Sequence, residues 1–154
     1  MGKPVKRSTY KTIVDEKDIP DIDTNETQTR LPAIILVDCS NSMMGSEDDL
    51  KLSVCAVYEE IMKNQVSSRA VELGIMTFND VIRVQRHIRE IYLQKDMGKK
   101  LEFKCEGQTL TGFAVKEALE ELENRKKLYY SSRSGIHCYS PLLFIISDGA
   151  PFCS

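Results

Sequence analysis

The sequence has no excess of charge of one sign and no hydrophobic run long enough for a membrane helix. Its 154 residues carry 21 Lys and Arg against 23 Asp and Glu, and this net charge of −2 disfavours a nucleic-acid binder, which usually has a basic excess. Apolar runs such as 32–37 have the length of a strand, well below the ~20 residues that cross a bilayer. Residues 1–30 contain no signal-peptide core. We therefore expect a cytoplasmic protein that binds neither nucleic acid nor membrane.

The sequence also lacks a paired cysteine motif. Its five cysteines are odd in number and widely separated, which argues against a structural zinc site and against a secreted disulfide framework. We expect reduced thiols, partly buried as small apolar side chains. They are Cys39, Cys55, Cys105, Cys138 and Cys153.

Residues 1–30 differ in composition from the remainder of the chain. A basic stretch of eleven residues is followed by an acidic one, and the few apolar residues follow no sustained period. Such a segment buries too little surface to offset its ordering entropy. We therefore expect a flexible polar tail over 1–30, with a short β segment near 12–14, and one domain over 31–154.

The pattern of apolar residues predicts an α/β domain. Strands are expected where apolar runs meet turn residues, at 33–37, 71–78, 81–84 and 141–146. Helices are expected at 47–64, at about 88–97 and at 112–127. Ser46 and Asp49 resemble a capping box at the start of the first helix. This order indicates a Rossmann-like fold with a central, mostly parallel sheet flanked by helices.

Two of the buried strands end in an aspartate, Asp38 and Asp148. Ligands of open α/β sheets gather beyond the carboxyl ends of the strands, so both side chains are candidates for a site. Asp38 is followed by Ser40 and Ser42, and a loop between the aspartates contains Thr109. Carboxylate and hydroxyl oxygens suit a hard divalent cation such as Mg²⁺ or Mn²⁺.

These motifs resemble a known metal site. D-C-S-N-S-M-M-G, G-Q-T-L-T-G and I-I-S-D-G, in that order, are similar to the metal-ion-dependent adhesion site of von Willebrand factor type A (VWA) domains over about 31–154. The resemblance implies direct coordination by serines, aspartates acting largely through water, and an acidic residue of a protein partner completing the shell. It implies a protein-interaction module that is not an enzyme. The metal residues that it implies are Asp38, Ser40, Ser42, Thr109 and Asp148.

Some positions depart from the family pattern or compete within it. Thr111 is the rival for the threonine role, but its place before Gly112 fits a helix entry better. Cys39 and Asn41 stand where the family usually has other small residues, and Cys39 is expected to be a semi-buried, inert thiol. Each candidate side chain also has a purely structural interpretation, as a helix cap or a turn-forming residue.

Longer segments resemble one branch of the family. V-E-L-G-I-M-T-F-N-D, E-N-R-K-K-L-Y-Y and S-P-L-L-F-I-I-S-D-G-A-P are similar to the bacterial cytoplasmic tellurium-resistance, TerY-like proteins. That resemblance implies a stress-response system with kinase and phosphatase partners.

Two other functions stay open. One is a VWA scaffold that uses no metal. The other is a metal-dependent phosphotransfer enzyme of the haloacid-dehalogenase type, which needs a second carboxylate two residues after the first, where this chain has Ser40.

The resemblance also bears on the end of the chain. A VWA sheet runs in the order 3-2-1-4-5-6, and this sequence supplies strands only up to the fourth. Strand 141–147 would then be an exposed apolar edge, without the last strands and helices of the fold. We expect either a truncated product of a longer chain or an edge covered by another polypeptide, and self-association of the chain alone.

Overall fold

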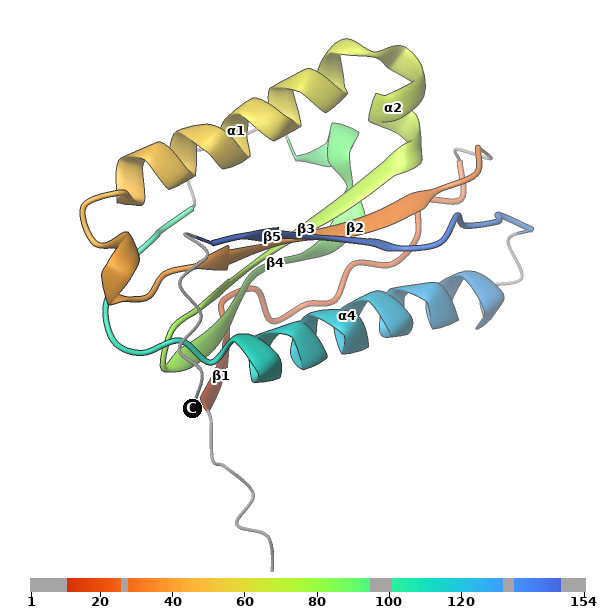
Figure 1. Cartoon of the computed structure of the whole chain (residues 1–154). Helices are drawn as coiled ribbons and strands as arrows, with labels where there is room; N and C mark the ends of the chain where they lie inside the picture. The colour runs from red at the N-terminus through yellow and green to blue at the C-terminus, as the bar shows by residue number, and fades with distance from the viewer. Residues whose placement is uncertain (1–10, 26–27, 95–100, 132–134, 148–154) are drawn as a thin grey trace, which may run out of the picture.

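The computed structural model describes residues 11–25, 28–94, 101–131 and 135–147. Within them a five-stranded sheet has the order β1-β4-β3-β2-β5 (Figure 1). Neighbouring strands are parallel except for the antiparallel β3–β4 hairpin. The expected central, mostly parallel sheet of an α/β fold is thereby confirmed. The strands are β1 (Lys11–Val14), β2 (Leu31–Asp38), β3 (Val71–Phe78), β4 (Val81–Glu90) and β5 (Leu142–Ile146).

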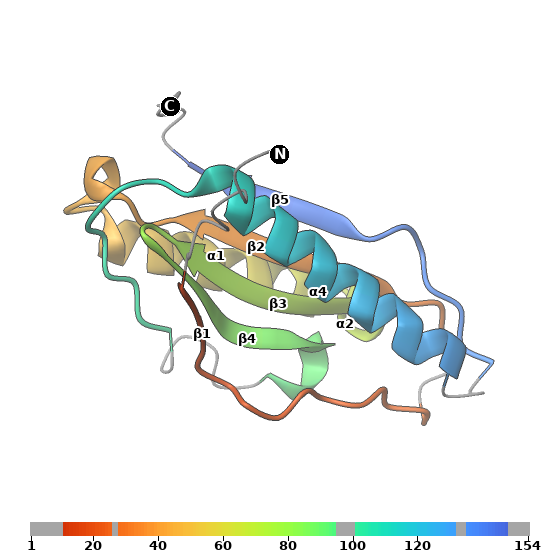
Figure 2. The same ribbon diagram turned by 90° about the horizontal axis from the view of Figure 1, so that it is seen from below.

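Helices cover both faces of the sheet. Helix α1 (Glu47–Lys63) lies on one face and α4 (Thr111–Ser131) on the other (Figure 2). Strands β2 and β3 are apolar on both sides because their alternating side chains feed two cores, one beneath each helix. The short α2 (Gln65–Ala70) follows α1, and 3-10 turns η1 (Asn41–Met43) and η2 (Ile91–Leu93) follow β2 and β4. Among the described residues, no helix is both long and apolar enough to cross a membrane.

Most expected elements are confirmed, and two local predictions are wrong. The helix expected at 88–97 is absent from the described part of that range, since β4 continues to Glu90 and η2 follows. The strand persists because Ile88 and Glu90 are both buried. Ser46 makes no side-chain capping bond, because its ψ of 6° is not the extended conformation of such a cap.

Part of the segment expected to be a flexible tail, residues 11–25 and 28–30, lies against the sheet. Strand β1 confirms the short β segment and pairs in parallel with the outer edge of β4. Beyond it, Ile22 is buried, and the Asp23 backbone N–H donates to Glu90 Oε1 at 2.7 Å. Polar bonding to the sheet edge and to buried charges, together with burial of Ile22 beside Tyr129 and Ile136, holds this segment. Residues 1–10 lie outside the described part.

A buried network of four charges lies opposite the carboxyl end of β2. Arg30 Nη1 contacts Glu72 Oε2 at 3.0 Å and Glu90 Oε1 at 3.1 Å. Arg125 Nε contacts Glu72 Oε1 at 2.6 Å, and its Nη2 contacts Glu90 Oε1 at 3.4 Å. All four side chains are at most 3% exposed. The two cations balance the two anions and join the residue before β2 to β3, β4 and α4.

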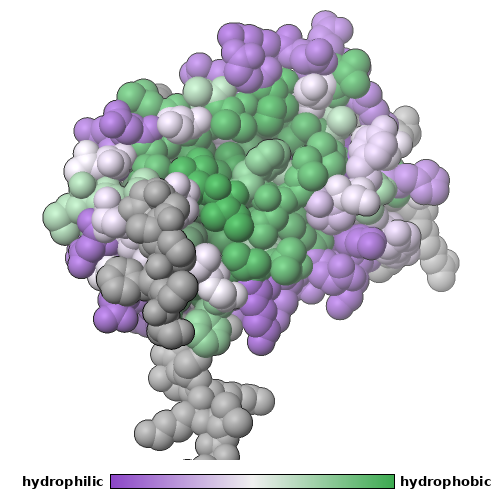
Figure 3. All heavy atoms as spheres, in the orientation of Figure 1, coloured by the Kyte–Doolittle hydropathy of each residue, from purple (hydrophilic) through white to green (hydrophobic). Residues whose placement is uncertain are grey.

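Strand β5 is an apolar edge, as expected. Within the described residues it pairs only with β2. Leu142, Phe144 and Ile145 are 42%, 51% and 48% exposed. A groove of about 480 Å³ between α1 and β5 is lined mainly by apolar side chains such as Val57 and Phe144. Figure 3 shows this apolar surface facing the viewer between the two helices.

Candidate metal site at the carboxyl end of the sheet

Asp38 anchors the candidate site. It is the last residue of β2, and only 1% of its surface is exposed. Its Oδ1 accepts a hydrogen bond from the Ser40 backbone N–H at 2.9 Å. Its Oδ2 accepts one from the Ser147 hydroxyl at 3.0 Å. The carboxylate is thus fixed at the point where β2 and β5 both end.

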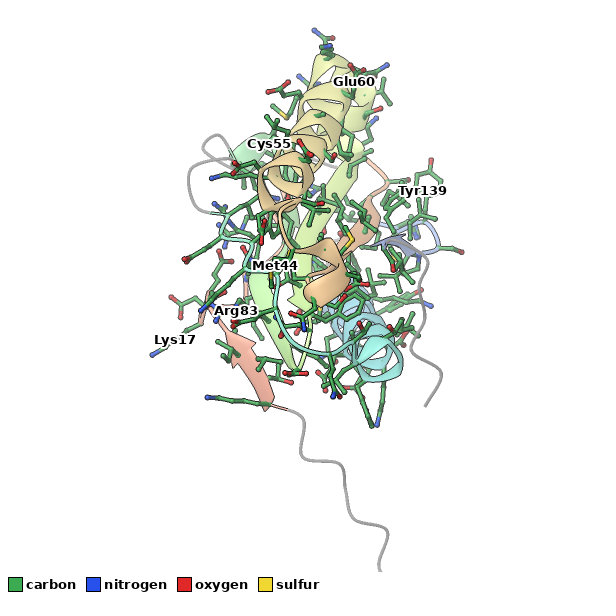
Figure 4. All side chains as sticks on the ribbon, turned by 60° about the vertical axis from the view of Figure 1, so that its left-hand side comes forward. Lys17, Met44, Cys55, Glu60, Arg83 and Tyr139 are labelled. Atoms are coloured by element: carbon green, nitrogen blue, oxygen red, sulfur yellow. The ribbon has the colours of Figure 1, made fainter. Side chains whose placement is uncertain are left out.

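The two serines of the motif face each other beside Asp38. Ser40 precedes η1 and is buried, whereas Ser42 lies within η1 and is exposed. Their hydroxyl oxygens are 3.0 Å apart. Figure 4 labels Met44, which directly follows this turn, and Glu60, which lies near the far end of α1. The motif therefore places two hydroxyls together, one of them accessible from outside.

The loop that carries Thr109 lies against the serine turn. The Glu106 backbone N–H donates to the Cys39 carbonyl at 3.0 Å. The Asn41 N–H donates to the Gly107 carbonyl at 3.0 Å, and the Gly107 N–H donates to Asn41 Oδ1 at 3.0 Å. Thr109, which is half-buried, is thereby brought to the same edge as Asp38.

Of two further residues assigned to this edge from the sequence, the structure describes Thr111 and does not describe Asp148. Thr111 is the first residue of α4, which agrees with the helix-entry role expected for it. Asp148 lies outside the described residues. The preceding residue, Ser147, lies beside Asp38 through its hydroxyl.

The thiols near the site are buried. Cys39 and Cys105 both belong to the core beneath α1. Burial raises the pKa of each thiol above its ordinary value, so little thiolate forms at neutral pH. Cys55 and Cys138 are also free and are half-buried. The four described cysteines agree with the expectation of reduced, partly buried thiols.

The contacts of three residues at this edge were not predicted from the sequence. Asn41 binds the Gly107 amide, and Asp80 Oδ1 accepts from the Gln108 backbone N–H at 2.7 Å. Gly107 has a φ of +76° and lies against the Asp80 carboxylate. The sequence signals are the N-D pair at 79–80, between two apolar runs, and the glycine at 107 that begins G-Q-T-L-T-G.

The donors present fit a hard cation. Adjacent ligands of an octahedral Mg²⁺, with bonds of about 2.1 Å, lie about 3 Å apart, close to the 3.0 Å between the Ser40 and Ser42 hydroxyls. Asp38 supplies a carboxylate next to them. Among the described residues no group of three or more His, Cys, Asp or Glu side chains could hold an ion. A site built from the described residues would therefore depend on hydroxyl oxygens, which add ligands without adding charge.

Comparison with known proteins gives matches among solved structures. No family model matches the chain, and no curated protein matches it. Among solved structures, the chain is similar to the crystal structure of the SpRpn10 VWA domain, with a TM-score of 0.48 and 19% sequence identity. The match covers 64% of this chain and 53% of that one, so this chain spans about half the length of its neighbour. The α/β fold class follows from the sheet order and the helical layers themselves.

Proposed function

We propose that this chain is a protein-interaction module whose contact site is built around a Mg²⁺ or Mn²⁺ ion. The ion would be held by Asp38, Ser40, Ser42, Thr109 and Asp148. The observation that carries the proposal is the placement of Asp38 and two facing hydroxyls at the carboxyl end of β2, with the Thr109 loop bonded against them. The ion would supply a positive charge that attracts an acidic residue of a protein partner.

The strength of that attraction depends on the charges of the residues that would hold the ion. Two carboxylates would balance the ion's charge, and the serine and threonine hydroxyls would bind it without adding negative charge. A carboxylate from outside therefore meets less repulsion than it would at an all-carboxylate site. We further propose, from the sequence resemblance alone, a TerY-like stress-response setting in the cytoplasm with kinase and phosphatase partners.

A metal-free scaffold is the second candidate. Both oxygens of Asp38 already accept hydrogen bonds from the chain, from the Ser40 amide and the Ser147 hydroxyl. A carboxylate satisfied in this way can hold the ends of β2 and β5 together without an ion. The two candidates differ in whether the protein binds a divalent cation.

Calorimetric titration with Mn²⁺ separates the two candidates. We expect weak binding by the wild-type protein, because a partner would supply the last ligand, and no detectable binding by Asp38→Ala. Asp48→Ala is the matched control, since it removes an exposed carboxylate in the first turn of α1. Equal affinities for the wild type and Asp38→Ala would refute the metal site. Partner capture that depends on Mn²⁺ and is lost with a chelator would then define the interaction.

We also propose that the module has no hydrolytic activity. Ser40 stands where a phosphotransferase of the kind considered would need its second carboxylate, and its hydroxyl contacts Ser42. An activated nucleophile needs an adjacent base. Metal-dependent hydrolysis of a phosphate ester by the pure protein, abolished in Ser40→Ala, would contradict this proposal.

A further inference from the structure

The loop over 101–110 has no helix or strand, yet it carries Thr109. Residues on both sides of Thr109 are bonded to the turn that joins β3 and β4. The Gln108 backbone N–H donates to Asp80 Oδ1 at 2.7 Å. The Leu110 backbone N–H donates to the Asn79 carbonyl at 3.2 Å. The backbone of Thr109 is therefore held between two successive residues of one tight turn.

The turn itself is well fixed. Asn79 Oδ1 accepts from the Val81 N–H at 2.9 Å, and the Asn79 N–H donates to the Val81 carbonyl at 3.0 Å. Asn79 Nδ2 also donates to the Lys104 carbonyl at 3.4 Å. The turn is coupled to the serine motif as well, because the Cys39 N–H donates to the Phe78 carbonyl at 2.8 Å.

The packing at Gly107 shows how closely the loop approaches Asp80. A Cβ at this position would overlap the Asp80 carboxylate, and the φ of +76° favours glycine. Only a residue without a side chain lets the loop come close enough for the Gln108 amide to reach Asp80. The close contact between the loop and Asp80 therefore requires glycine at position 107.

We infer that Asp80 is a positioning residue that holds Thr109 at the candidate metal site by accepting the Gln108 amide hydrogen bond. Its role is that of a hydrogen-bond acceptor and not of a metal ligand. The consequence for metal affinity rests on the proposed function, whereas the positioning of the loop does not.

Two substitutions separate these roles. Asp80→Asn keeps an acceptor oxygen at the same place and removes the charge, whereas Asp80→Ala removes both. We expect the Mn²⁺ affinity to fall roughly ten- to a hundredfold in Asp80→Ala, the usual effect of losing a residue that supports a metal ligand. Asp80→Asn should stay close to the wild type. Glu102→Ala, which removes an exposed carboxylate of the same loop, is the control.

Amide hydrogen exchange, followed by NMR without metal, tests the positioning directly. Exchange at Gln108 and Leu110 should be faster in Asp80→Ala, whereas Asp80→Asn should restore the wild-type rates. Unchanged exchange in Asp80→Ala would overturn the positioning role. Asp80→Asn binding Mn²⁺ as weakly as Asp80→Ala would overturn it in favour of a charge effect. A wild type that binds no Mn²⁺ would refute the proposed function, and the exchange rates would still decide the role of Asp80.

Discussion

At the residue scale, the close approach of the 101–110 loop to Asp80 depends on the absence of a side chain at Gly107. We predict that Gly107→Ala lowers the free energy of unfolding by about 1–3 kcal/mol, because alanine is strained at positive φ and its Cβ meets Asp80. Urea denaturation measures the loss. Gly112→Ala is the control, since a Cβ at this exposed position near the start of α4 meets open space. Equal effects of the two substitutions would contradict the close approach of the loop.

His87 of β4 has a charged partner on α4. Its Nδ1 lies 3.1 Å from Glu121 Oε2, and the imidazole is buried. The hydrogen bond to Glu121 raises the pKa of His87, against the opposing effect of burial. This pair links β4 to α4.

The raised pKa predicts a pH dependence of stability. Below the ordinary histidine pKa of about 6.5, the imidazole is charged in both the folded and unfolded states, and the stabilisation is fully present. It is lost as the pH rises through the higher pKa of the folded state. Urea denaturation at a series of pH values should show this His87 contribution disappearing as the pH rises above about 6.5. Glu121→Gln should remove that part of the slope, and an unchanged slope would refute the coupling.

At the scale of elements, the buried network joins the strand ends to α4. Removing one member leaves an uncompensated charge in the core, so we predict that Arg125→Met costs about 3–5 kcal/mol of the free energy of unfolding. The double variant Arg125→Met with Glu72→Leu should be more stable than the single one, because no unpaired carboxylate remains. Denaturation with urea compares them. Lys63→Ala, which breaks only an exposed pair with Glu60, should leave the midpoint unchanged. A double variant less stable than the single one would contradict this picture.

The network also explains the arrangement of the segment after β1. Arg125 Nη1 donates to the Pro20 carbonyl at 2.7 Å, and Arg30 Nη2 donates to the Asp23 carbonyl at 2.7 Å. A stretch with few apolar residues is therefore ordered by buried cations that bind its backbone. Sequence composition alone does not contain this information, because the cations come from distant elements.

At the scale of the whole molecule, the exposed edge at β5 predicts self-association. Among the described residues β5 pairs with β2 on one side only, and the other side of such an edge strand presents backbone donors and acceptors to another chain. Sedimentation of the chain should show association that increases with concentration. Ile145→Lys should reduce it by placing a charge on the edge. Leu52→Lys, at an exposed position of α1 outside the groove, is the control. A wild type that stays monomeric at all concentrations would refute this prediction.

The sequence by itself determined the main elements and the motif. The run 33–37 predicted a buried central strand because it is apolar on both faces, and 71–78 predicted a strand because it is rich in apolar residues. Residue order records both properties directly. The spacing of Asp38, Ser40 and Ser42 likewise predicted neighbouring side chains, because these residues lie within one turn.

Only the tertiary structure decided the features that depend on contacts between distant segments. Arg30, Glu72, Glu90 and Arg125 look like surface charges in the sequence, and they are buried because their partners come from other elements. β4 continues through 88–90 because this stretch is enclosed by other parts of the chain, where local pattern had suggested a helix. The position of Thr109 depends on hydrogen bonds that its neighbours donate to the Asn79 carbonyl and the Asp80 carboxylate, about thirty residues earlier. Local sequence determines the backbone conformation that each residue prefers, whereas tertiary packing determines which distant segment it contacts.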